Sequence, residues 1–322
     1  MELKELVDFM GSDESAAKAR TQGGEEINYF PTKHFKLTVD SAAAVRSGTV
    51  SPQNAGQIVK TMEWSVDNNF LLKNDLMVLN IIANNNWKRP IYFATTVGTE
   101  NYLNLTSYFQ LEGLAYRLVP IKTMSSSEGI PGRVETGVMY QNVMSKFLWG
   151  NMMNPQVYMD ENNLRMTTNL RINFGRLAEE LLIEGRRDSA VAVLDKCLEV
   201  MPEQNVPYNY FMLRIADMYF RAAGVTNPDS IARASLEINK QKELVDKGNA
   251  ILTRVFDNYT DVMDYYLSLK GTNYYKLVDM DMNQSMYILQ TTVSVLRQAN
   301  QTALAEKYDK RFMEYAQRAG NQ

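Results

Sequence analysis

The residue types that carry most hydrolytic and metal chemistry are rare in this sequence. Its 322 residues include one histidine, His34, and one cysteine, Cys197. A Ser–His–Asp triad needs a histidine, and most zinc sites need histidines or several thiolates. His34 falls on the polar side of a predicted strand, and Cys197 takes a small, buried position in a helical pattern. We therefore interpret both as structural and predict no catalytic residue and no metal site.

Paired carboxylates are the other acid–base candidates. Asp160 lies next to Glu161, and Asp279 lies two residues before Asp281. Side chains one or two positions apart on a helix do not face each other, so they rarely reach one reacting atom. Solvated helix ends account for both pairs. We therefore expect that this chain is not an enzyme by itself.

Nucleotides, nucleic acids and other cofactors are not indicated either. The glycine-containing stretches GGEE, at 23–26, and GIPGR, at 129–133, lack the spacing and the strand-to-helix context of a phosphate-binding loop. The formal net charge is -3 and the pI is about 5.5, whereas a nucleic-acid interface needs a basic face. We predict no cofactor and no nucleic-acid partner.

One basic and aromatic cluster precedes a predicted strand. Trp87, Lys88 and Arg89 are consecutive, and Pro90 follows them. Such a cluster could contact lipid headgroups or a lipid phosphate. The simpler alternative is a strand entry that a buried tryptophan stabilises.

Paired aromatic residues are frequent in the C-terminal half. We interpret most of them as side chains that fill the space between helices. Tyr274 and Tyr275 are the exceptions, because they follow Gly271 in a predicted loop. Their rings could offer flat faces to a sugar or a peptide, so both are candidate contact residues.

The first half predicts a flexible linker over 1–27 and a mixed α/β domain over 28–161. Phe35, Leu37 and Val39 alternate with polar residues, which is typical of a strand with one buried face. Helical spacing predicts a helix from Asn74 to Asn84, with Asn74 or Asp75 as its cap. The run from Arg89 to Ala94 has the β-branched and aromatic composition of a buried strand.

The second half, 162–322, predicts an all-α domain of tetratricopeptide-like helical repeats. In the clearest unit, Gly185 takes the turn, Asp188 is the expected N-cap and Pro202 ends the second helix. One unit cannot bury its own apolar face, so we expect stacked neighbours, with further units near 212–255 and 288–312. The aromatic, small, turn and terminating positions of the first unit are Phe174, Leu177, Ala178, Leu181, Gly185, Ala190, Leu194, Cys197 and Pro202.

No segment is apolar enough to cross a bilayer. The most apolar stretch, Leu76 to Ala83, contains Asn80 and is far shorter than the roughly 20 residues that a spanning helix needs. The first residues lack the apolar core of a signal peptide. A single cysteine excludes an internal disulfide and leaves the redox compartment open.

Three tracts carry a family resemblance: Lys73 to Val97, Tyr108 to Pro120 and Arg176 to Phe211. They resemble the C-terminal extramembrane part of a bacterial multi-spanning membrane-protein family of unknown function. That family is related to protein O-mannosyltransferases, which are membrane-embedded glycosyltransferases that use lipid-linked sugars, and its members end in tetratricopeptide-like repeats. The likeness covers nearly the whole chain.

The resemblance implies a place and a supporting role. It puts the chain on the extracytoplasmic, periplasmic face of the inner membrane, beside the transmembrane part of the same or a partner protein. The helical repeats would bind a protein or peptide acceptor. The family's catalytic residues belong to its spanning part, so none of them is carried over to this sequence.

Two other interpretations remain open. A free-standing tetratricopeptide-like adaptor would bind a peptide or protein partner through its repeats. An independent enzyme in the α/β domain is the least favoured, because the usual groupings of nucleophile, base and metal ligands do not occur in the sequence.

Overall fold

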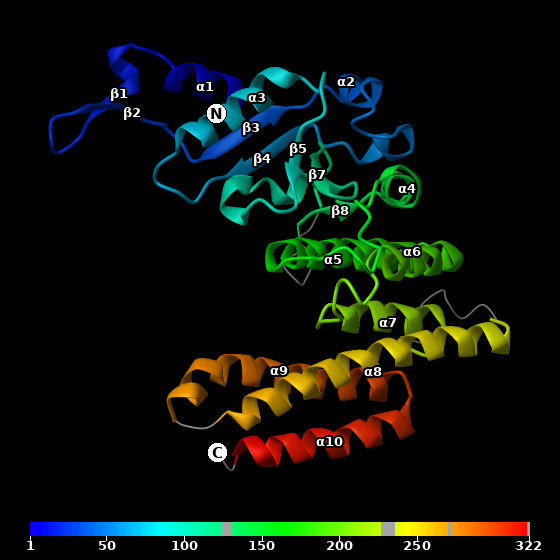
Figure 1. Ribbon diagram of the computed structural model, residues 1–322. Coiled ribbons are helices and arrows are strands. Elements are labelled where there is room, and N and C mark those ends of the chain that lie inside the picture. The colour runs from blue at the N-terminus through cyan, green and yellow to red at the C-terminus, as the bar shows by residue number, and fades with distance from the viewer. Residues whose placement is uncertain (124–130, 227–235, 270–271, 321–322) are drawn as a thin grey trace. The chain divides into compact units, whose positions relative to one another are not determined.

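The computed structural model describes residues 1–123, 131–226, 236–269 and 272–320, and for 272–277 it describes the main chain only. The chain divides into two compact units, Met1–Met139 and Tyr140–Gln322, and each is described by itself. The first is small and rich in β-strands, and the second is helical (Figure 1). The predicted α+β class is confirmed. The units divide 22 residues before the predicted boundary at 161/162.

The first unit contains short strands in three separate sheets. Strand β1 pairs with β2, β3 pairs with β4, and a four-stranded sheet has the order β5-β7-β6-β8. All these pairs are antiparallel except β6 with β8. The strands are β1 Lys18–Arg20, β2 Glu26–Asn28, β3 His34–Thr38, β4 Thr61–Ser65, β5 Tyr92–Ala94, β6 Phe109–Leu111, β7 Ala115–Leu118 and β8 Arg133–Val134. The α-helices are α1 Leu3–Met10, α2 Ser41–Arg46 and α3 Lys73–Asn85, and α4 Thr136–Gln141 lies where the units divide.

Two predictions for this unit are confirmed. Strand β3 alternates as expected, with Phe35 buried and Lys36 exposed. Helix α3 covers the predicted range, although its cap differs. Leu72 is the N-cap residue, and its main-chain N–H donates to the Asp75 carboxylate at 2.8 Å. Asp75, in the first turn of the helix, therefore accepts the hydrogen bond of the N-cap residue's N–H.

Two other predictions are wrong. Residues 3–10 are not linker but helix α1, which packs against α3 with Leu3 and Leu6 fully buried. The apolar residues of this short helix are spaced to form one buried face. The polar residues that follow it give the N-terminal segment as a whole the composition of a linker. Strand β5 is not buried, because it lies at the edge of its sheet and leaves Tyr92 47% exposed.

The second unit contains six helices of 11 to 31 residues within its described residues, and successive helices pack against each other. Buried apolar side chains fill the space between them, including Phe174, Leu177, Ala178, Leu181, Ala190, Leu194 and Cys197 at the predicted positions. The helices are α5 Glu161–Ile183, α6 Arg187–Val200, α7 Met212–Ala222, α8 Ile238–Ser268, α9 Thr272–Gln298 and α10 Thr302–Gly320.

The turn between α5 and α6 follows the prediction in part. Gly185 has a φ of 74°, the left-handed conformation that glycine adopts at little cost. The expected N-cap is wrong: α6 begins at Arg187 with Arg186 as N-cap. Asp188 lies in the first turn, where it pairs with Lys240 at 2.7 Å. Helix α6 ends at Val200, just before Pro202.

Helices α7 and α8 are antiparallel and differ greatly in length. Helix α7 has 11 residues, whereas α8 has 31. The side chain of Gln241, near the start of α8, donates to the Ala223 carbonyl after the end of α7 at 2.9 Å. Near the other end of α7, Asn258 donates to the Tyr208 carbonyl at 3.1 Å. The second half of α8 therefore lies beside the connection that precedes α7.

Candidate binding pocket on the helical unit

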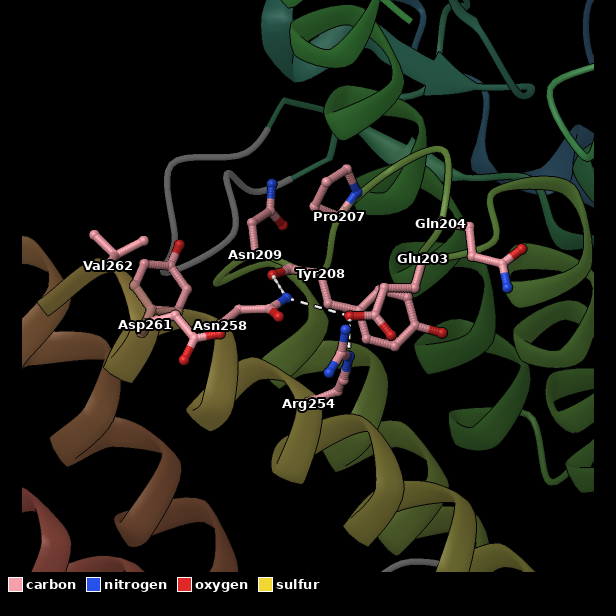
Figure 2. A pocket seen from close by; sticks show the side chains of 10 residues that line it. Glu203, Gln204, Pro207, Tyr208, Asn209, Arg254, Asn258, Asp261 and Val262 are labelled. Atoms are coloured by element: carbon pink, nitrogen blue, oxygen red, sulfur yellow. Dashed lines mark hydrogen bonds and ion pairs between the residues drawn. The ribbon is translucent and has the colours of Figure 1, made fainter. Parts of the chain in front are cut away.

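A pocket lies where the connection between α6 and α7 meets the second half of α8. Its volume is about 730 Å³. Figure 2 shows side chains of the connection on one side and side chains of α8 on the other. The residues that line it are Glu203, Gln204, Pro207, Tyr208, Asn209, Arg254, Asn258, Tyr259, Asp261 and Val262.

Helical periodicity explains which α8 residues reach the pocket. Arg254, Asn258, Asp261 and Val262 are spaced by four, three and one positions, so they lie on one face. The opposite side of α8 packs on α10. There Phe256 stacks on Tyr308 with their ring centroids 4.2 Å apart.

Glu203 joins the two walls of the pocket. Its carboxylate Oε1 accepts a hydrogen bond from Arg254 Nε and another, at 3.3 Å, from Asn258 Nδ2. The Asn258 amide also donates to the Tyr208 carbonyl at 3.1 Å, as Figure 2 shows. A charge-assisted hydrogen bond and a main-chain bond thus fix the connection to α8.

The buried side chain of Arg171 forms hydrogen bonds with the main chain of the connection. This α5 side chain is 1% exposed, and its guanidinium donates to the main-chain carbonyls of Met201 at 3.2 Å, Val206, and Pro207 at 2.8 Å. The same group lies 5.3 Å from the centroid of the Tyr208 ring. Burial lowers the pKa of Arg171, but an arginine stays charged in proteins. The fork geometry of the guanidinium therefore shapes the pocket wall.

The pocket has the chemistry of a binding site. Burial raises the pKa of Tyr208 and of Tyr259, which keeps both phenols neutral. Their rings, Pro207 and Val262 supply apolar surface, and amides and ions supply hydrogen-bonding groups. No nucleophile lies beside a general base among these lining residues, and the described part of the chain contains no group of three or more potential metal ligands.

The predicted contact residues belong to different units, three to the first and two to helix α9 of the second. Trp87 is buried at the end of α3 in the first unit, whereas Lys88 and Arg89 beside it are exposed. Tyr274 and Tyr275 belong to helix α9, not to a loop, so that expectation is wrong. Their side chains fall outside the described residues.

The Trp87 turn has an unusual backbone. Asn86 and Trp87 have φ angles of 43° and 59°, so two consecutive residues other than glycine are left-handed. The Asn85 side chain holds this turn, because it accepts from the Arg89 N–H at 3.0 Å and donates to the Arg89 carbonyl at 2.7 Å. The alternative of a buried tryptophan at the strand entry matches this arrangement.

Two features of the sequence indicate the residues that form the pocket wall. Arg171 is a charged residue within the helical spacing of apolar residues that predicts the buried side of α5, and a buried arginine needs several acceptors. The segment 202–209 combines two prolines with three amide side chains and a tyrosine pair nearby, a composition that favours a structured connection over a helix.

Comparison with known proteins gives one finding. Residues 1–138 match the family TMEM260-associated domain 2, which covers the first unit and less than half of the chain. The match is consistent with a domain of a TMEM260-like protein. No curated protein and no solved structure matches the chain. Among the described residues, none of the helices is long and apolar enough to span a membrane.

Proposed function

We propose that this chain is a non-catalytic binding module of a TMEM260-like membrane protein, and that its helical unit holds a segment of a protein partner. The observation that carries the proposal is the pocket between 203–209 and α8. It combines tyrosine rings with amide and ionic groups that hydrogen bonds hold between the connection and α8. Aromatic surface and convergent polar groups are what protein pockets use to orient a ligand.

The finer parts of the proposal rest on the sequence. They are a tetratricopeptide-like character of the helical unit, an extracytoplasmic position at the inner membrane, and a parent protein that resembles bacterial O-mannosyltransferase-related glycosyltransferases. Helices that pack in succession, with buried residues at the repeat positions, support the first part. The family match over 1–138 supports an origin in a membrane protein.

Retention of peptides tests the pocket. The whole chain is immobilised and exposed to a degenerate heptapeptide library, and bound peptides are identified by mass spectrometry. We expect Val262→Trp to fill the pocket and to lower retention at least tenfold. Tyr265→Trp, also on an exposed part of α8 but outside the pocket lining, is the matched control. Equal retention by all three proteins would contradict the proposal, and binding of a glycan array in place of peptides would reassign the pocket to a saccharide.

Cell fractionation tests the membrane assignment. An antibody against this chain should detect a band far larger than 36.8 kDa that stays with the inner membrane. A band near 36.8 kDa in the soluble fraction would favour the alternative of a free-standing adaptor. That result would leave the pocket and its peptide test unchanged.

A further inference from the structure

The length of the pocket limits what it can hold. Its α8 wall runs from Arg254 to Val262, which corresponds to about 12 Å along a helix axis. An extended chain advances about 3.3 Å per residue, so the wall matches about four extended residues. An extended segment of that size can lie along the α8 wall and does not need a deep cavity.

The two ends of the α8 wall differ in charge. At the first end, Arg254 is paired with Glu203, so this end carries no net charge. Toward the other end, Asp261 is exposed, and no hydrogen bond or ion pair links it to another described residue. Among the described lining residues, the carboxylate of Asp261 is therefore the one charge that no opposite charge neutralises.

The neighbouring acids of α8 do not share this property. Asp257 pairs with Arg311 at 3.0 Å, and Asp264 pairs with Arg318 at 2.8 Å and accepts from the Tyr315 hydroxyl. These contacts direct both acids toward α10. Asp261 alone among the three lines the pocket and keeps its charge available to a ligand.

We infer that the pocket selects an extended segment of about four residues that carries a lysine or arginine, whose side chain pairs with Asp261. The inference rests on the proposed function. Amide side chains of the lining can hydrogen-bond main-chain groups of the segment, and the rings of Tyr208 and Tyr259 contact its apolar or proline residues. An acidic side chain at the same place is repelled.

The experiment uses two degenerate heptapeptide libraries on the whole chain, one with lysine and one with glutamate fixed at the central position. An exposed ion pair changes affinity by about two- to fivefold, so we expect that preference for the lysine library. Asp261→Asn should remove the preference, and Asp261→Lys should reverse it. Asp246→Lys is the control, because Asp246 is also exposed on α8 but does not line the pocket.

The outcomes separate the inference from the proposed function. Equal retention of both libraries by the unaltered chain overturns the basic preference and leaves peptide binding intact. A reversal by Asp246→Lys as large as that by Asp261→Lys also overturns it, because the preference would then reflect the net charge of -3. Retention of neither library above the Val262→Trp level overturns both.

Discussion

Arg171 belongs to helix α5 and Tyr208 to the connection between α6 and α7, and the guanidinium carbon of Arg171 lies 5.3 Å from the centroid of the Tyr208 ring. The same guanidinium donates hydrogen bonds to three main-chain carbonyls of the connection before α7. One buried cation thus fixes the wall that carries Glu203 and Tyr208. The shape of the pocket depends on a residue that does not line it.

Replacing Arg171 with lysine should destabilise the fold and weaken peptide retention together. A lysine cannot reproduce the planar fork, so buried carbonyls lose their donors, at a cost of about 1–3 kcal/mol. Urea unfolding measures this change. Arg165→Lys is the matched control on the same helix, because Arg165 is exposed and its ion pair is with the exposed Glu161. Equal unfolding free energies for the two variants would argue against the role of Arg171.

Gly248→Ala and Gly175→Ala should have opposite effects although both glycines are helical. A Cβ at Gly248 would lie 2.6 Å from the Phe220 ring, so α7 and α8 would be forced apart. Such overpacking costs about 1–3 kcal/mol. A Cβ at Gly175 would meet its nearest neighbour, the Arg214 side chain, at 3.5 Å. There alanine should stabilise the helix by up to about 1 kcal/mol. Thermal unfolding of both variants distinguishes the two cases, and a stabilised Gly248→Ala would contradict the close contact.

The Cys197 thiol should resist modification in the folded protein. Complete burial raises its pKa to about 12, so the reactive thiolate is scarce near neutral pH. We expect no reaction with iodoacetamide at pH 8 until urea unfolds the helical unit. The unfolded chain serves as the positive control. Stoichiometric labelling without denaturant would show that the α5 and α6 hairpin opens.

Glu179 should make the helical unit sensitive to acid. Burial alone would raise the pKa of its carboxyl, but hydrogen bonds and ion pairs with Arg221 and Arg214 outweigh burial and leave the pKa below 4.5. Because the pKa is lower in the folded state, the stabilisation is present above pH 4.5 and is lost as the pH falls through the folded value.

Thermal unfolding across that pH range tests this effect. Glu179→Gln should lower the melting temperature at neutral pH and reduce its decline in acid. Burial raises the pKa of the neighbouring Asp217, so protonation of Asp217 in acid changes the stability in the opposite direction. The comparison with Glu179→Gln therefore isolates one carboxyl. Glu161→Gln is the control, since its side chain is exposed at the start of α5. Parallel acid profiles of the Glu179 variant and the unaltered chain would contradict the prediction.

Lys88 and Arg89 should contribute to binding of anionic membranes if the first unit faces a bilayer. Both are exposed, and no described acid pairs with their side chains. Each cation contributes about 1 kcal/mol near an anionic surface. Sedimentation with vesicles of equal phosphatidylglycerol and phosphatidylcholine measures the loss in Lys88→Ala/Arg89→Ala. The control is Lys18→Ala/Arg20→Ala, whose cations pair with Asp13 and Glu26. Unchanged binding by the Lys88 and Arg89 variant would remove this idea.

The sequence predicted the features that depend on neighbouring residues. The hairpin of α5 and α6, its glycine turn and its buried face follow from helical periodicity and from the conformational freedom of Gly185. Helix α3 and strand β3 follow from similar patterns. Local rules were less successful where a short element depends on burial by distant residues, as with helix α1 and the edge strand β5.

The tertiary structure alone decided the pocket. Glu203 and Arg254 are 51 residues apart, and their pairing requires α8 to run past the short helix α7. Which acids of α8 are neutralised depends on how α10 packs on one side of that helix, so the exposed charge of Asp261 cannot be read from its neighbours in the chain. Periodicity identifies a buried face, but the partner that covers it, and therefore which charges stay unpaired, is fixed only by long-range packing.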